Sequence, residues 1–141
     1  MRHRIGALIA AVLLPLTLLT NATPANATDK EFYACQDVSC PGTGETGGTI
    51  VWNNRTATLR AWLDHPTNAT WYTTATYEAF AGTTKVDTAA GSVGPNVHLI
   101  DFPPFAIGDP NRVGGIDRIR ITVCSLIDGY NACGDQYNFW R

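Results

Sequence analysis

Hydrophobic and polar residues alternate along several short segments of the chain. Within residues 56–64, small and aliphatic side chains occupy every second position. Residues 116–124 repeat this pattern, with Ile119, Ile121 and Val123 expected to point inward. A period of two residues is typical of a strand with one buried face. No segment keeps a helical period, so the pattern predicts an all-β protein.

Glycine, asparagine, proline and aspartate interrupt the apolar segments at short intervals, which is typical of turns. Besides the two alternating segments, strands are predicted at 31–35, 49–52, 71–80, 85–88, 97–102 and 136–140. Loops are predicted at 65–68, 91–96 and 105–115. About seven or eight antiparallel strands with short connections favour a two-sheet β-sandwich. A closed β-barrel is the alternative.

The first 27 residues have the layout of a secretory signal peptide. Arg2 and Arg4 form a basic head, residues 5–19 are uncharged, and small residues at Ala25 and Ala27 flank Asn26. The apolar run is shorter than the roughly 20 residues that cross a bilayer. We therefore expect residues 1–27 to be removed and residues 28–141 to form a single secreted, extracellular domain.

The expected mature chain is mildly acidic. It keeps eight of the ten Lys and Arg residues against 12 Asp and Glu, which gives a net charge of −4. Nucleic acids and anionic membranes attract clustered cations, so neither is expected as a partner. The protein is expected to be a monomer that has no membrane contact after signal cleavage.

Four cysteines lie in the expected mature chain: Cys35, Cys40, Cys124 and Cys133. Turn-forming residues separate the members of each neighbouring pair, so two local disulfides are the favoured pairing. A link between the two pairs would close a longer loop and stabilise the fold more, so the connectivity stays open. The local pairing also predicts that residues 116–124 and the last strand form a hairpin with its disulfide near the turn. The spacings do not match a zinc ribbon.

The sequence offers no set of residues for nucleophilic catalysis. None of the three serines lies in a G-x-S-x-G elbow. His65 in a Pro-flanked loop and His98 on a strand are both expected to be ordinary surface residues. We therefore predict no catalytic residue, no cofactor and no enzyme activity.

Oxygen-bearing side chains at Asp109, Asn111 and Asp117 frame a loop that partly matches a calcium-binding pattern. The EF-hand pattern fails at Val113 and at Arg120, where a bidentate acid should stand. We predict no metal site, and an irregular calcium site in this loop stays open.

Trp62 is the most informative candidate for binding. By alternation it shares a face with Arg60 and Asp64, opposite the small and aliphatic residues of its strand. An exposed indole beside hydrogen-bonding side chains suits a sugar ring, although this face would instead be internal if the strand were turned over. Tyr130, on the Cys124–Cys133 loop, is the fourth ligand-binding candidate, and the neighbouring aliphatic residues of that loop are expected to fold back onto the sandwich.

Three features together resemble small, mostly uncharacterised secreted proteins of actinobacteria. These are the Ala-rich signal, the V-W-N-N-R-T-A-T-L segment at 51–59, and the I-D-R-I-R-I-T-V-C segment at 116–124 with its partner Cys133. The resemblance implies an extracellular location and a disulfide-bonded β fold, and it carries no catalytic residues.

Three function classes remain from the sequence. The first is a secreted, non-enzymatic extracellular binding protein with a polysaccharide as candidate ligand. The second is an inhibitor of a secreted hydrolase such as a protease or amylase, because a rigid stapled loop loses little entropy on binding. The third is a small secreted hydrolase.

Overall fold

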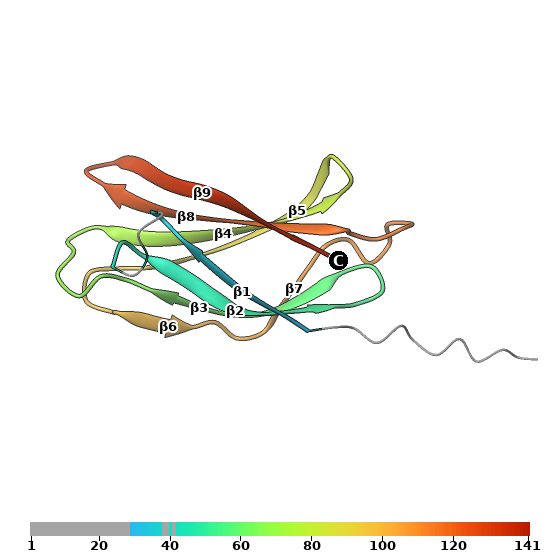
Figure 1. Ribbon diagram of the computed structural model, residues 1–141, viewed down its shortest axis with the longest axis horizontal. Helices are drawn as coiled ribbons and strands as arrows, with labels where there is room; N and C mark the ends of the chain where they lie inside the picture. The colour runs from blue at the N-terminus through green and yellow to red at the C-terminus, as the bar shows by residue number, and fades with distance from the viewer. Residues whose placement is uncertain (1–28, 38–39, 41) are drawn as a thin grey trace, which may run out of the picture.

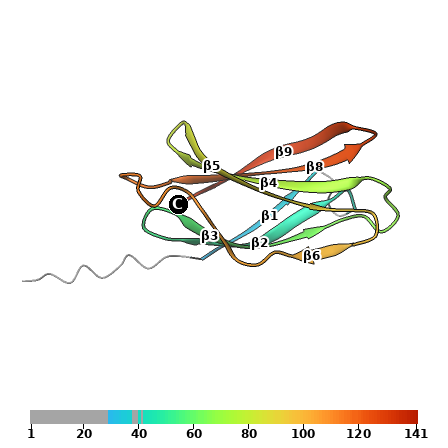
Figure 2. The same cartoon turned by 180° about the vertical axis from the view of Figure 1, so that it is seen from behind.

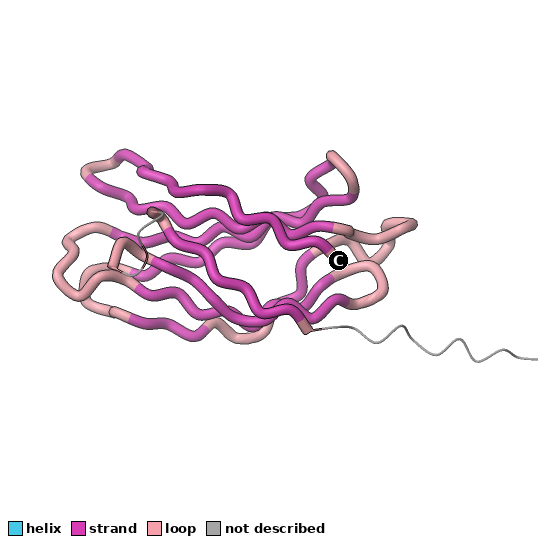
Figure 3. Tube along the Cα trace, in the orientation of Figure 1, coloured by secondary structure: helices cyan, strands magenta, loops and turns pink. Residues whose placement is uncertain are grey.

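The computed structural model describes residues 29–37, 40 and 42–141, so the expected signal peptide lies outside the described residues. Nine strands form two antiparallel sheets that pack face to face (Figures 1 and 2). The strands are β1 (Lys30–Cys35), β2 (Glu45–Trp52), β3 (Ala57–Asp64), β4 (Tyr72–Ala81), β5 (Thr84–Val93), β6 (Leu99–Asp101), β7 (Phe105–Ile107), β8 (Arg118–Ile127) and β9 (Tyr130–Trp140). The described chain contains no helix, as the tube in Figure 3 shows, which confirms the all-β prediction.

The five-stranded sheet has the order β1-β2-β3-β6, and β7 pairs with the other half of the β3 edge. Between β6 and β7, Phe102 donates its backbone N–H to the carbonyl of Ala61 at 2.9 Å. Pro103 and Pro104 follow, and neither has a backbone N–H to donate. The prolines therefore divide this edge into two short strands.

The four-stranded sheet has the order β5-β4-β8-β9. Gly82, with φ of 60°, turns the chain from β4 into β5. Asp128 and Gly129, with φ of 49° and 83°, form the two-residue turn between β8 and β9. Positive φ at both central residues matches the twist of a tight hairpin.

The core lies between the two sheets and takes its side chains from every second position of the longer strands. The inward face of β8 is as predicted, with Ile119, Ile121 and Val123 buried. The sequence left open which face of β3 is internal, and the structure buries the face of Ala57, Leu59, Ala61 and Leu63. The two sheets remain separate in the described chain, so the protein is a β-sandwich and the barrel alternative was wrong.

Contacts between β1 and β9 close one side of the sandwich. Phe32 packs edge-on against Phe139, with ring centroids 5.9 Å apart. A side chain at Gly134 would collide with the backbone of Gln36, so the two strands approach closely at this position. The Gln36 side-chain amide donates to the carbonyl of Ala132 at 3.1 Å. On the other side, β5 faces the β6–β7 segment.

Two predicted segments, the strand at 85–88 and the loop at 105–115, were wrong in extent. The strand predicted at 85–88 runs over ten residues as β5, so Gly91 to Val93 belong to a strand and not to a loop. The predicted loop 105–115 begins with the short strand β7. β5 pairs with β4, and β7 pairs with β3. This pairing makes both segments strands, although their polar or Gly-containing sequences do not predict a strand.

Both local cysteine pairs are confirmed. The Cα atoms of Cys35 and Cys40 lie 6.1 Å apart, and those of Cys124 and Cys133 lie 4.0 Å apart. Cys124 pairs with Cys133 across β8 and β9, so the predicted hairpin with a disulfide near its turn is also confirmed. Two disulfides indicate an oxidising environment of the extracellular type. Within the described chain no helix is long and apolar enough to cross a membrane.

Candidate functional site

The outer face of the five-stranded sheet carries two aromatic rings side by side. Tyr33 on β1, Gly47 on β2 and Trp62 on β3 lie directly opposite one another across the three strands. The rings of Tyr33 and Trp62 have centroids 6.1 Å apart and are tilted by 53°. A side chain at Gly47 would lie 2.5 Å from Trp62 Cζ2, so the indole occupies the space above this glycine. We call this surface the Trp62–Tyr33 face.

A shallow groove of about 440 Å³ runs along the Trp62–Tyr33 face. Its walls combine the two aromatic rings with polar groups and exposed strand backbone. They are formed by Glu31, Phe32, Tyr33, Gly48, Thr49 and Trp62. Tyr33 is 45% exposed, so its ring is available to a ligand.

Carboxylates surround the Tyr33 hydroxyl. It donates a hydrogen bond to Glu45 Oε2. Partial burial, this hydrogen bond, and the negative charges of Glu45 and Asp64 together raise the pKa of Tyr33 to about 12. Tyr33 is therefore a neutral phenol at any physiological pH, and it holds the Glu45 carboxylate at the edge of the groove.

Three of the four sequence-predicted ligand residues come together on this face. Trp62 lines the groove, and Arg60 and Asp64 lie two residues before and after it on β3. Arg60 lies opposite Thr49, and Asp64 lies opposite Glu45, so Trp62 has a cation on one side and two neighbouring carboxylates on the other. Asp64 Oδ1 also accepts the backbone N–H of His65 at 2.8 Å.

Tyr130 lies apart from the other three candidates. It begins β9 at the tip of the β8–β9 hairpin, in the opposite sheet, and is 80% exposed. Leu126 and Ile127 at the same tip are also exposed, so the expectation that they fold back onto the sandwich was wrong. The hairpin continues beyond the core because its strands remain paired up to Ile127 and Tyr130.

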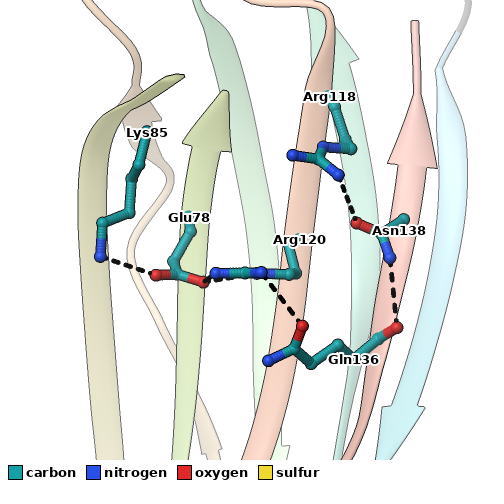
Figure 4. Close-up of polar contacts among 6 residues, drawn as sticks. All are labelled: Glu78, Lys85, Arg118, Arg120, Gln136 and Asn138. Carbon is teal, nitrogen blue, oxygen red and sulfur yellow. Dashed lines mark hydrogen bonds and ion pairs between the residues drawn. The ribbon is translucent and has the colours of Figure 1, made fainter. Parts of the chain in front are cut away.

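The outer face of the four-stranded sheet carries a row of charged side chains, drawn in Figure 4. Glu78 on β4 accepts hydrogen bonds from Lys85 on β5 at 2.9 Å and from Arg120 Nε on β8 at 2.7 Å. Arg120 also donates to Gln136 on β9 at 3.0 Å. The row therefore crosses all four strands and pairs its one carboxylate with two cations.

Arg118, the next outward residue on β8, forms a different arrangement. Its guanidinium lies 4.1 Å from the ring centre of Phe80 and 5.1 Å from that of Trp140. Trp140 is 53% exposed. The exposed indole of Trp140 is engaged with a cation, whereas the half-buried indole of Trp62 pairs with a second aromatic ring.

The prediction that His65 is an ordinary surface residue was wrong. His65 is only 1% exposed. Its Nδ1 lies 2.9 Å from Thr73 Oγ1, its Nε2 lies 3.4 Å from the carbonyl of Ala69, and its ring packs edge-on against Trp71. The imidazole thus orders the β3–β4 loop. His98 is exposed, as predicted.

A cleft of about 320 Å³ opens between the sheets, on the side where β5 faces the β6–β7 segment. Aromatic and small side chains line it: Tyr77, Ala89, Ala90, Gly91, Phe102, Pro103, Phe105 and Ala106. Tyr77 is its one titratable group, and the Tyr77 hydroxyl is bonded to Thr46 Oγ1 at 2.7 Å. The cleft offers apolar contact and no acid–base pair.

The carboxylates of the loop considered for calcium serve local hydrogen bonds. Asp109 Oδ1 accepts the backbone N–H of Asn111, and Asp117 Oδ2 accepts that of Gly82, both at 2.8 Å. In the residues that the structure describes, no group of three or more His, Cys, Asp or Glu side chains is placed to hold a metal ion.

Sequence reasoning missed Tyr33 and Gly47. The alternation of β1 already places Tyr33 opposite in direction to Phe32 and Ala34, and the Gly47–Gly48 pair marks a close approach on β2. The missing information was the register between β1, β2 and β3, which brings these residues beside Trp62.

No protein-family model, curated protein sequence or solved structure matches the chain. The resemblance to secreted actinobacterial proteins therefore stays an expectation from the sequence.

Proposed function

We propose that this protein is a secreted, non-enzymatic binding protein that holds a polysaccharide chain on the Trp62–Tyr33 face. The observation that carries this proposal is the pair of rings of Trp62 and Tyr33, 6.1 Å apart on an open groove. A pyranose ring presents C–H groups on one side, and these pack well against an aromatic face.

The polar groups around the two rings also support a polysaccharide site. Thr49 and Glu31 line the groove and can exchange hydrogen bonds with sugar hydroxyls. The groove is open along the sheet and not an enclosed cavity, which suits a chain that passes across the protein.

The charges of this face favour a neutral polysaccharide over an acidic one. Glu31, Glu45 and Asp64 contribute three carboxylates around the groove, whereas Arg60 contributes one cation. A polymer that carries uronate or sulfate groups would meet repulsion from these carboxylates.

The expected setting is extracellular. The two disulfides fit an oxidising compartment. Secretion itself rests on the signal-like segment 1–27 of the sequence.

A retention assay on insoluble polysaccharides tests the proposal. The purified mature chain is mixed with cellulose, chitin and cell-wall material, and the protein left in solution is measured over a range of polysaccharide amounts. We expect saturable retention on at least one neutral polymer. If the protein stays in solution with all of them, the proposal is wrong.

A further inference from the structure

Charge is distributed unequally along the long axis of the sandwich. A cut across both sheets, between rows of paired residues, divides the described chain into two ends. One end, the acidic end, consists of residues 32–37, 40, 42–48, 61–75, 91–104 and 123–135, and the remaining described residues form the other end. In Figure 1 the acidic end contains the β8–β9 turn and lies opposite the label of the C-terminus.

All eight Lys and Arg residues of the described chain lie outside the acidic end. The twelve carboxylates divide six and six: Asp37, Glu45, Asp64, Asp101, Asp128 and Asp135 belong to the acidic end. With His counted as neutral, the acidic end therefore has a net charge of −6, and eight cations against six acids give the other end +2.

Exposed apolar side chains gather at the same end. Seven of the nine large hydrophobic side chains that are exposed in the described chain belong to it, and they are Tyr33, Tyr72, Val97, Leu99, Leu126, Ile127 and Tyr130. A freely solvated acidic surface gains nothing from exposed aromatic and aliphatic groups. Exposed aromatic side chains and the absence of lysine are features of protein interfaces, and the six carboxylates add the charge that a cationic partner complements.

Several of these apolar residues adjoin one another around the hairpin tip. Tyr72 lies opposite Leu126 across β4 and β8, and Ile127 lies opposite Tyr130 across the hairpin. The ring of Tyr72 occupies the space that a side chain at Gly94 would need, which brings it against the β5–β6 connection. The disulfide between Cys124 and Cys133 staples the strands behind this tip, so the patch is held with little conformational freedom.

We propose that the acidic end is a docking surface for a protein partner whose contacting surface is rich in Lys and Arg. The six uncompensated carboxylates would steer such a partner, and Tyr130, Leu126 and Ile127 would pack against its apolar side chains. Tyr33, Glu45, Trp62 and Asp64 of the Trp62–Tyr33 face also lie within the acidic end, so the docking proposal is tested at the β8–β9 hairpin tip, which belongs to the opposite sheet.

Selection from a random library of displayed dodecapeptides on the immobilised mature chain tests the partner chemistry. We expect the enriched peptides to be net positive and to contain aromatic or aliphatic residues. A tip variant that combines Tyr130→Ala with Asp128→Asn should lose most of this enrichment. Asn tolerates the positive φ of position 128, so the turn is preserved.

The matched control combines Val113→Ala with Asp29→Asn, which removes one exposed apolar group and one acid from the other end. The most enriched peptide is then synthesised, and its affinity for each variant is measured. We expect the tip variant to bind at least about tenfold more weakly and the control to bind like the parent protein. Equal binding to the tip variant and the parent, enrichment of neutral or acidic peptides, or no enrichment at all would overturn the proposal.

Two other ligands of the acidic end are tested alongside the peptides: a second copy of this chain and a cationic saccharide. Sedimentation at rising concentration detects a second copy docked by its cationic end, and salt-sensitive dimers in place of peptide binding would overturn the proposal. Chitosan oligomers provide a cationic saccharide. If they compete with the peptide and bind the tip variant as well as the parent, the surface recognises charge alone and the protein-partner proposal is wrong.

Discussion

The indole of Trp62 covers Gly47, the residue directly opposite it on β2, and fills the space that any side chain there would need. This relationship holds the indole against the sheet and beside Tyr33. The groove of the Trp62–Tyr33 face therefore depends on a glycine as much as on its aromatic rings.

Gly47→Ala should displace the Trp62 ring and destabilise the protein by about 1–3 kcal/mol, because the added methyl group overpacks a filled position. Urea unfolding followed by tryptophan fluorescence measures this. In a Trp62→Ala background the same substitution should cost much less, since the colliding ring is absent. An equal cost in both backgrounds would show that Trp62 does not lie over Gly47.

Tyr77 links the two sheets through Thr46 and should make stability fall at alkaline pH. Burial raises its pKa to about 12, although the hydrogen bond with Thr46 acts in the opposite direction. Between pH 10 and 12 the unfolded chain loses the phenol proton while the folded chain keeps it, so stability decreases by up to about 2–3 kcal/mol over that range. Urea titrations at several pH values measure this decrease.

The control for this prediction is the Tyr77→Phe variant. It should be less stable than the parent protein at neutral pH, but its stability should decrease less above pH 10. Tyr33, also with a raised pKa, is half-exposed and should contribute less to the decrease. An identical alkaline decrease in the parent protein and in Tyr77→Phe would contradict the assignment.

Glu78 should make stability fall at acid pH. Burial alone would raise its pKa, but hydrogen bonds from Lys85 and Arg120, together with their charges, lower it below the usual value. As pH falls, the unfolded chain therefore binds a proton first, and stability present above the usual pKa is lost as pH passes through the folded value. Glu78→Gln should cost about 1–2 kcal/mol at neutral pH and flatten the acid decrease.

The matched control for Glu78 is Glu31→Gln, which changes an exposed carboxylate on the opposite sheet. It should leave both the neutral stability and the acid decrease nearly unchanged. If the two variants behave alike, the charged row of the four-stranded sheet does not stabilise the fold.

The Cys124–Cys133 disulfide should stabilise the hairpin tip. Replacing both cysteines with Ser should lower the melting temperature, by an amount that corresponds to about 2 kcal/mol, and should speed amide exchange at the tip more than in the core. The equivalent change at Cys35 and Cys40 gives the comparison, because that disulfide lies at the end of β1 and does not join β8 to β9. An unchanged melting temperature for the Cys124–Cys133 variant would contradict the prediction.

Alternation in the sequence was sufficient for the inward face of β8, whose inward side chains are all aliphatic. For β3 it separated the two faces, but it did not determine which of them is buried, because Trp62 stands on the face opposite the small and aliphatic residues. It failed for β5, whose polar residues and Gly91 are ordered by pairing with β4. The burial of His65 was also missed. A histidine in a predicted loop does not indicate that Thr73 and the carbonyl of Ala69 will provide hydrogen-bond partners for its ring in the interior.

Part of the candidate site could be predicted from the alternation along a single strand. Trp62, Arg60 and Asp64 share one strand, so their common face follows from a period of two. Tyr33, Gly47 and Glu45 join them only through the register of β1 and β2, and the charge separation between the two ends of the sandwich follows only from the full topology. Neither relationship can be predicted from one strand alone.

The most direct test of the account compares two tryptophans on opposite faces, the half-buried Trp62 and the exposed Trp140. Trp62→Ala and Trp140→Ala each remove one indole, and each variant is measured for retention on the neutral polysaccharide that binds the parent protein. We predict that Trp62→Ala weakens retention at least about tenfold while Trp140→Ala binds like the parent. Equal retention of the Trp62 variant and the parent, or equal loss in both variants, would contradict a polysaccharide site on the Trp62–Tyr33 face.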